Sequence, residues 1–169
     1  MMKLHNLLLL LGGLLGGVQG CAQPANPGAG RTGPLTAEVL YSTNQCGLAA
    51  SHPTAVWIDN PQSLAQIYQG FPVLPQIQPP PVDFAQSGVL LIGMGQRPTA
   101  GYGLGLVEGS PQLKGDTLEV KVNWWEPSPG RLQAQVLTTP CLLVKIPAVP
   151  FQRVTIIDQT GQVRLSTRR

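Results

Sequence analysis

Side chains able to do nucleophilic or metal chemistry are few in this sequence of 169 residues, which contains three cysteines and two histidines. Cys21, Cys46 and Cys141 lie far apart in the sequence, and His52 is the only histidine after residue 20. A structural zinc site takes four nitrogen or sulfur ligands, and a nucleophilic cysteine needs a neighbouring base. The acidic residues form no recognisable pair for acid/base catalysis: Glu38, Asp59, Asp83, Glu108, Asp116, Glu119, Glu126 and Asp158. We therefore expect a protein that is not an enzyme and that holds no metal and no other cofactor.

The first twenty residues have the pattern of a secretory signal segment. Lys3 gives a positive start, and the apolar stretch of residues 4–18 is shorter than the roughly 20 residues that span a bilayer. Val18-Gln19-Gly20-Cys21 then resembles the lipobox of bacterial lipoproteins, with Gln19 in place of a small residue. We expect residues 1–20 to be a signal peptide and Cys21 to be lipidated, which makes the protein extracytoplasmic. A secreted protein without a lipid, cut near Gly20 or Ala22, is the alternative.

Residues 21–33 are rich in proline, glycine and alanine and show no apolar periodicity. This composition is typical of a disordered tether, so we expect a lipidated tether over 21–33 and a single β-rich domain over 34–169. Ala22 follows Cys21, and the absence of an aspartate there favours the outer membrane if the organism is Gram-negative.

If Cys21 carries a lipid, Cys46 and Cys141 remain as the two thiols of a protein in an oxidising compartment. Such thiols are expected to pair, and the disulfide would close a loop of roughly 95 residues. The alternative is that one of the two acts as a nucleophile with His52 as its base.

The segment from Arg97 to Tyr102 combines groups suited to protein recognition. Pro98 fixes one backbone angle and Gly101 permits a positive φ, so a rigid turn is expected. Arg97 and Tyr102 supply a cation and an aromatic ring, and Thr99 can hydrogen-bond its own backbone. We predict that these five residues bind a partner protein; if Arg97 and Tyr102 serve this binding, their side chains should be exposed at one end of the fold.

A purely structural role is the alternative for this segment. It would then be a turn between two core strands, with Gln135 and Thr138 satisfying its backbone.

The composition favours a β fold, because charged residues make up only 11% while the chain has 20 glycines and 17 prolines. The formal net charge of +3 is too small to indicate nucleic-acid binding. One helix is predicted after Asn60, with Pro61 in its first turn and Gly70 at its end. Periodicity predicts strands over 35–42, 54–59, 89–94, 101–107, 117–125, 133–138, 141–146, 154–157 and 163–165.

Short strands at this spacing with one short helix predict a mostly β fold, either an antiparallel β-sandwich or a partly open barrel. Residues 73–82 contain four prolines and are expected to form a loop. Residues 101–107 alternate glycine with larger residues, which suits the close approach of another segment. Of Trp124 and Trp125, one ring is expected to face the core and the other to lie over the surface.

Three pieces of sequence occur in an order that resembles the PrcB C-terminal family of protease complex subunits. Gly95 to Tyr102 is similar to the family's Pro-Thr-Gly-Gly-Tyr-like loop, with Ala100 in place of its first glycine. A proline-containing turn follows at Glu126, and Gln135 to Pro140 matches the family's Gln-x-x-Thr-x-Pro pattern before a last apolar strand. The resemblance covers about residues 83–147. It implies a lipoprotein that associates with a secreted protease complex.

The same loop also resembles the Asn-Pro-Thr-Thr-Gly loop of chagasin-like cysteine protease inhibitors, with Arg97 in place of their asparagine. Our leading expectation is a membrane-anchored, non-enzymatic lipoprotein that binds a protein such as a secreted protease or its precursor. The alternatives are a protease inhibitor that uses the Arg97–Tyr102 loop and a purely structural envelope lipoprotein.

The lipidation hypothesis predicts that Cys21→Ser releases the protein from the membrane fraction or leaves the signal segment uncleaved, because the sulfur that receives the lipid is lost. Fractionation of cells expressing the variant and mass spectrometry of the native protein measure this. A native mature chain with an unmodified N-terminus would contradict the hypothesis.

Overall fold

A computed structural model describes residues 33–72 and 78–169 of the chain. The expectations for residues 1–20, for Cys21 and for most of the tether therefore fall outside the described residues. Eleven elements follow one another: β1 Gly33–Pro34, β2 Glu38–Thr43, β3 Thr54–Ile58, α1 Pro61–Gln69, β4 Ser87–Gly93, β5 Gly103–Leu106, β6 Gln112–Lys114, β7 Thr117–Trp125, β8 Cys141–Pro147, β9 Arg153–Ile157 and β10 Val163–Arg168. The prediction of a mostly β fold with one short helix is confirmed.

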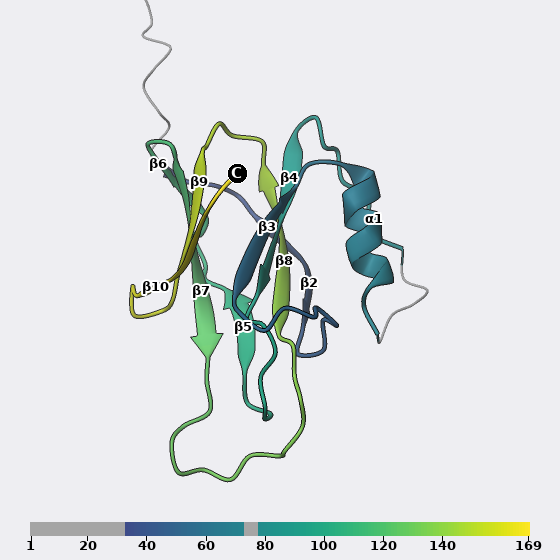
Figure 1. The fold of residues 1–169 in the computed structure, drawn as a ribbon. Coiled ribbons are helices and arrows are strands. Elements are labelled where there is room, and N and C mark those ends of the chain that lie inside the picture. Colours follow the sequence, from purple (N-terminus) through teal and green to yellow (C-terminus); the bar gives the residue numbers. More distant parts are fainter. Residues whose placement is uncertain (1–32, 73–77) are drawn as a thin grey trace, which may run out of the picture.

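The strands form two sheets that face each other (Figure 1). The first has the order β1-β6-β7-β9-β10, with β5 pairing beside β6 on β7, and the second has the order β2-β8-β4-β3. All pairs are antiparallel except β7 with β9, which run parallel because the chain crosses to the second sheet through β8 between them. The sheets remain separate and do not close into a barrel, although the hydroxyl of Ser42 donates to the carbonyl of Leu104 across one side at 3.2 Å.

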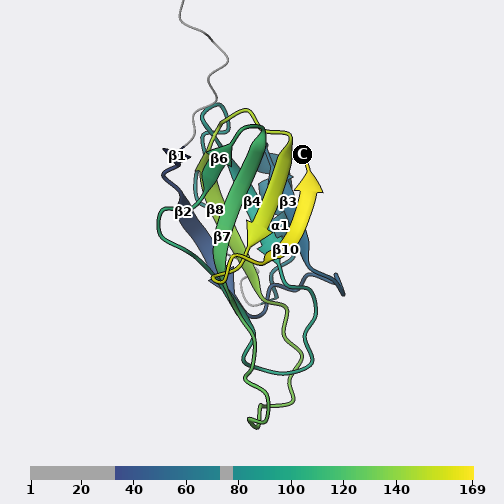
Figure 2. The same ribbon diagram turned by 90° about the vertical axis from the view of Figure 1, so that its left-hand side faces the viewer.

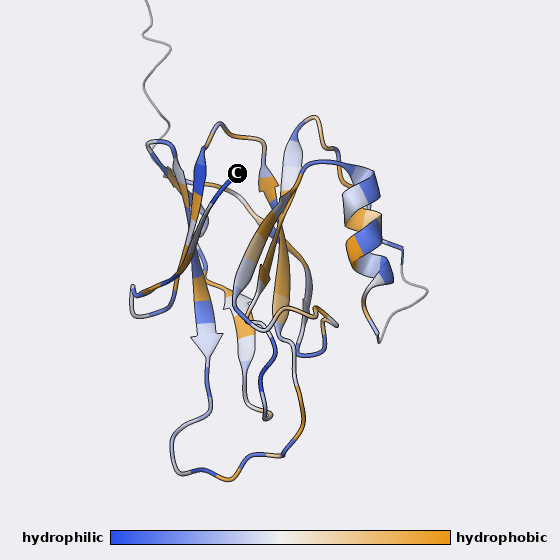
Figure 3. Cartoon of the chain, viewed as in Figure 1, coloured by the Kyte–Doolittle hydropathy of each residue, from blue (hydrophilic) through white to orange (hydrophobic). Residues whose placement is uncertain are grey.

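Two apolar cores lie on the two faces of the second sheet. Leu90 and Ile92 of β4 point into the space between the sheets, where they meet alternate residues of β7 such as Val120. Leu91 of β4 points to the opposite face, which packs against α1 through Leu64. The hydropathy colouring shows the same arrangement, with apolar strands β4 and β8 in the middle of the molecule (Figure 3). The continuous apolar run of β4 follows from burial on both faces.

The helix begins and ends where the sequence predicts. The side chain of Asn60 accepts a hydrogen bond from the Ser63 amide at 2.8 Å, and Pro61 is the first helical residue. Gly70 ends the helix with φ −77°, so it caps without adopting a left-handed conformation. Leu64 and Tyr68 bury the apolar face. Among the described residues, no helix has the length and apolar character needed to cross a membrane.

The strand predicted over 133–138 is wrong. These residues lie in a long connection between β7 and β8, and most of their side chains are exposed. Val136 donates to the carbonyl of Ala134 at 3.0 Å, a tight local turn that an extended strand excludes. Of the proline-rich loop predicted over 73–82, residues 73–77 lie outside the described part, and 78–82 form no helix or strand.

The predicted disulfide is confirmed: the sulfur atoms of Cys46 and Cys141 are 2.02 Å apart and their Cα atoms 5.7 Å apart. Both residues are buried in the core beneath α1. The bond joins the loop after β2 to the start of β8. Because both sulfur atoms are in the disulfide, neither residue is a free thiol. This excludes the alternative in which one of them acts as a nucleophile.

We predict that the double variant Cys46→Ala/Cys141→Ala loses about 3–5 kcal/mol of unfolding free energy, because the bond closes a loop across a sequence separation of 95 residues. Urea denaturation of the variant beside the oxidised protein measures the loss. The oxidised protein treated with reductant is the matched control and should approach the variant. An unchanged urea midpoint would show that the cross-link does not constrain the unfolded chain.

Candidate functional site

Two loops meet at the end of the molecule opposite β1. The first connects β4 to β5 and carries the predicted recognition turn, and the second is the long connection from β7 to β8. Both extend beyond the sheets at the lower end of the molecule (Figures 1 and 2). Figure 2 shows β1 and β6 at the upper end.

Backbone hydrogen bonds join the two loops. The amide of Arg97 donates to the carbonyl of Thr138 at 2.8 Å, and the amide of Thr138 donates back to the carbonyl of Arg97 at 2.9 Å. The hydroxyl of Thr138 donates to the carbonyl of Thr99 at 3.1 Å, and the amide of Ala100 donates to the carbonyl of Ala134 at 3.0 Å. The turn is therefore held at both ends by the second loop.

This arrangement confirms half of the structural alternative. Thr138 satisfies the turn's backbone as expected, whereas the side-chain Nε2 of Gln135 donates within its own loop, to the carbonyl of Gln133 at 3.4 Å. Gly101 has φ +95°, so it adopts the positive φ that a glycine permits at this position. A Cβ there would stand 3.0 Å from the side-chain oxygen of Gln133 in addition to the cost of that backbone conformation.

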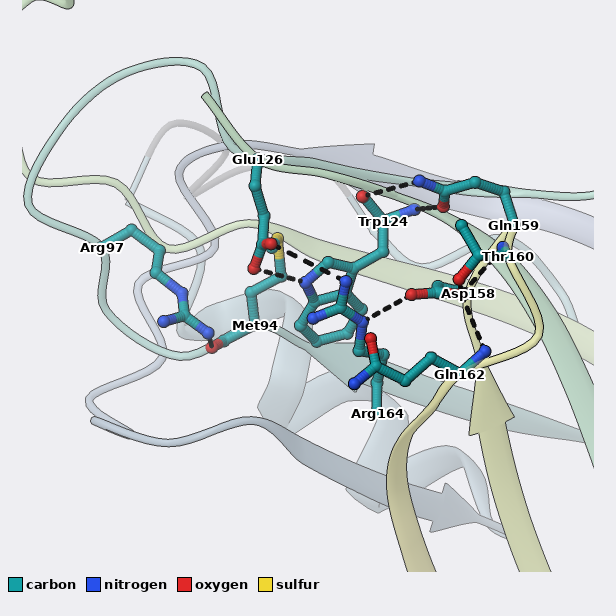
Figure 4. Close-up of polar contacts among 9 residues, drawn as sticks. All are labelled: Met94, Arg97, Trp124, Glu126, Asp158, Gln159, Thr160, Gln162 and Arg164. Atoms are coloured by element: carbon teal, nitrogen blue, oxygen red, sulfur yellow. Dashed lines mark hydrogen bonds and ion pairs between the residues drawn. The ribbon is translucent and has the colours of Figure 1, made fainter. Parts of the chain in front are cut away.

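The side chain of Arg97 lies along the loop and is not fully exposed. Its Nη2 donates to the carbonyl of Met94 at 2.8 Å (Figure 4), and its guanidinium lies 5.5 Å from the centre of the Tyr102 ring. Tyr102 itself packs against the core between the sheets. The expectation that both side chains would be exposed is thus wrong, because Arg97 lies over the Tyr102 ring and Tyr102 packs against the core. Pro98 and Gly101 are the exposed members of the predicted site, and Thr99 is half-buried.

Exposed apolar side chains gather on the second loop. Leu132 is exposed to 103% of its reference area, Leu137 to 59% and Val136 to 45%. The exposure of these side chains was not predicted, because residues 133–138 were expected to form a strand. The signal that could have revealed it is the Pro-x-Pro-Gly stretch of residues 127–130, which begins a loop that has no partner strand.

Trp125 borders an open hollow between the sheets. Its ring lies over β5, where a Cβ on Gly105 would stand 2.9 Å and one on Gly103 3.1 Å from ring atoms. This confirms that the glycine-rich face of β5 allows a close approach, and that Trp124 points inward while Trp125 lies over the surface. The hollow, of about 430 Å³, is lined by Ser42, Thr43, Asn44, Gly101, Tyr102, Gly103, Leu104 and Trp125.

The base of the second loop is joined to the β9–β10 hairpin through Arg164 (Figure 4). Glu126, the first residue of the loop, accepts from Trp124 Nε1 at 3.1 Å and lies 3.7 Å from Arg164 Nη2. Arg164 Nε donates to Asp158 at 2.8 Å, and the guanidinium lies 5.4 Å from the centre of the Trp124 ring. One cation therefore links two carboxylates and an aromatic ring.

Asp158 is 1% exposed and organises the hairpin turn. The hydroxyl and amide of Thr160 and the amide of Gln162 donate to its Oδ1. The Thr160 hydroxyl contributes most to holding the pKa of Asp158 well below its usual range; burial opposes the shift, and the Gln162 amide and Arg164 support it. In the sequence Asp158 stands apart from the other acidic residues, and the Asp-x-Thr-Gly run is the available sign of a turn stabilised by its side chain.

The lower half of β7 also depends on this hairpin. Gln159 Oε1 accepts from the amide of Trp124 at 2.8 Å, and Gln159 Nε2 donates to the carbonyl of Trp124 at 3.3 Å. A side-chain amide thus takes the place of a strand partner where the pairing of β7 with β9 ends. It holds Trp124, and with it the start of the second loop, in line with the sheet.

His52 is exposed and shares a hydrogen bond of 2.8 Å with the hydroxyl of Ser51 through Nδ1. Over residues 33–72 and 78–169, the structure brings together no group of three histidine, cysteine, aspartate or glutamate side chains able to hold a metal ion.

The segment that holds both loops can be compared with known proteins. Residues 89–147 match the PrcB C-terminal family. The resemblance expected over about residues 83–147 is confirmed. The PrcB C-terminal match runs from β4 to the end of β8, so it contains both ends of the Arg97–Thr138 backbone pair. It leaves out Cys46, Asp158 and Arg164. No curated protein and no solved structure matched the chain.

We predict that Asp158→Asn destabilises the protein at pH 7 and that the difference from wild type shrinks as the pH falls below about 4. A carboxylate whose pKa is lowered on folding stabilises the folded state above its unfolded-state pKa, near 3.9, and loses that contribution as protons bind. Urea titrations between pH 2.5 and 7 measure the effect.

Glu108→Gln is the control for this prediction, since Glu108 is an exposed carboxylate. A deficit for Asp158→Asn that is equally large at both ends of the pH range would instead point to packing alone.

Proposed function

We propose that this protein is a membrane-anchored extracytoplasmic lipoprotein whose β domain binds another protein, without catalysis, in association with a secreted protease. The PrcB C-terminal match over residues 89–147 suggests association with a component of a protease complex. The lipid on Cys21, the extracytoplasmic location and the binding role are the further parts of the proposal.

The observation that carries the binding role is the end formed by the two loops. It combines a turn held in one conformation by backbone bonds to Thr138 with uncovered apolar side chains on the neighbouring loop, Leu132 above all. Preorganised loops with exposed apolar groups favour protein binding, because little conformational entropy is lost on association.

The position of this end in the molecule agrees with the proposed anchor. β1, the first described strand, lies at the opposite end from the two loops (Figure 2). A lipid on the N-terminal side of β1 would therefore leave the loops directed away from the membrane, where they are free to meet a partner.

A protease inhibitor is a second candidate, favoured by the exposure of Pro98 and Gly101 at the tip of a rigid turn. An inhibitor would block turnover by a secreted cysteine or serine protease when added in stoichiometric amounts. A binding partner without inhibitory action would leave turnover intact.

The test places a photo-activated cross-linking amino acid at Gln96, an exposed residue beside Arg97, and in a second strain at Gln66, an exposed residue of α1. Irradiation of the native cells followed by mass spectrometry identifies the attached proteins. We expect a secreted protease or its precursor to be attached at Gln96 and not at Gln66. Equal attachment at both positions, or no protease at either, would refute the proposed function.

A further inference from the structure

The loop end is the end of the molecule formed by the β4–β5 and β7–β8 connections. Its positive and negative charges are not balanced. Glu126 lies next to Arg164, and Asp158 receives a hydrogen bond from the same arginine. Arg97 and Arg131 have no carboxylate partner among the residues that the structure describes. Arg131 is exposed at the far part of the second loop. The available charge on this end is therefore positive.

Arg97 is a cation with unused hydrogen-bonding capacity. Its Nη2 donates to the carbonyl of Met94, and its Nε is buried without a partner and out of reach of a ligand, so Nη1 is the nitrogen available to a binding partner. A half-buried cation interacts more strongly with a carboxylate than an exposed one does. Contact with Tyr102 holds the guanidinium in place, so a carboxylate would meet a preorganised group.

Apolar residues stand close in sequence to the residue whose backbone pairs with this cation. Leu137 precedes Thr138, whose backbone pairs with Arg97, and Val136 follows the turn at Ala134. Leu137 is 59% exposed and Val136 45% exposed. Leu132, next to Arg131, is a further exposed apolar side chain in the far part of the loop.

We propose that the loop end recognises a protein segment in which an aspartate or glutamate stands beside apolar residues. The carboxylate binds the Arg97 guanidinium, and the apolar residues pack on Leu137, Val136 and Leu132. This inference rests on the proposed function and names the chemistry of the partner. A protein segment is favoured over a lipid surface, because the proposed anchor lies at the opposite end from the loops.

The experiment uses the full lipidated chain held in phosphatidylcholine nanodiscs and a displayed library of random twelve-residue peptides. We expect selected peptides to be enriched in an acidic residue within two positions of leucine, isoleucine, valine or phenylalanine. Arg97→Gln and Leu137→Ser should each weaken their binding at least tenfold. Arg153→Gln and Val56→Ser, an exposed arginine and an exposed apolar residue elsewhere, are the matched controls and should change it less than twofold.

A double-mutant cycle locates the contact. Replacing the acidic residue of a selected peptide with its amide should weaken binding to the wild type as much as Arg97→Gln does, and the two changes together should add nothing further. Arg97→Gln could lower the melting temperature, because the carbonyl of Met94 loses its hydrogen-bond donor. In that case the acid-to-amide change in the peptide by itself tests the contact, since it leaves the protein unchanged.

Three results would overturn the inference: selected peptides without acidic residues, equal binding of acid and amide peptides, or bridging of the nanodiscs to phosphatidylglycerol vesicles that Leu132→Ser abolishes. The proposed function is judged separately. A protease attached at Gln96 in cells, together with peptides that lack acidic residues, would retain the function and reject this recognition chemistry.

Discussion

The pairing of β4 with β8 is the interaction on which the rest of the structure depends. Seven residue pairs join the two strands, from Ser87 with Pro147 to Gly93 with Cys141, and both faces of the pair are buried. One face forms the core between the sheets and the other the core beneath α1. The pairing continues beyond the sheet, since the amide of Met94 donates to the carbonyl of Pro140 at 2.9 Å and Arg97 then pairs with Thr138. The turn around Arg97 is thus an extension of the buried β4–β8 ladder.

A second constraint holds the far side of the site. The connection from β7 to β8 is long and mostly exposed, and a loop of this kind would by itself sample many conformations. Its end is held by Thr138, and its beginning by Glu126 and by the Gln159 amide on Trp124. Arg164 contacts Glu126 and is held by Asp158, and both Arg164 and Asp158 lie outside the segment that matches the PrcB C-terminal family. The matching segment supplies both loops, and the last hairpin of the chain positions one of them.

The rigidity of one loop and the exposed apolar side chains of the other are the features behind the proposed binding role. The turn around Arg97 is rigid because its polar backbone atoms are satisfied by Thr138 and Ala134. The apolar side chains of Leu132, Val136 and Leu137 are exposed. Burying such side chains on a partner yields roughly 25 cal/mol for each Å² of apolar surface removed from water, while a rigid turn limits the entropy lost. The hollow beside Trp125 adds a concave surface at the edge of the same end.

Much of the fold could be predicted from local sequence. The helix followed from Asn60, Pro61 and Gly70, the buried strands β4 and β7 from their apolar patterns, and the disulfide from two thiols left to pair. The strand predicted over residues 133–138 failed because a pattern of apolar residues does not say whether a partner strand is available to cover them. The same limit affected the site. The sequence indicated a rigid turn with Pro98 and Gly101, since those residues restrict or permit backbone angles locally. Only the tertiary structure decided that Arg97 and Tyr102 lie against each other, that Thr138 and not Gln135 holds the turn, and that Asp158 is buried. Those outcomes depend on contacts between segments far apart in the chain, and their energies are set by which groups exclude water from one another.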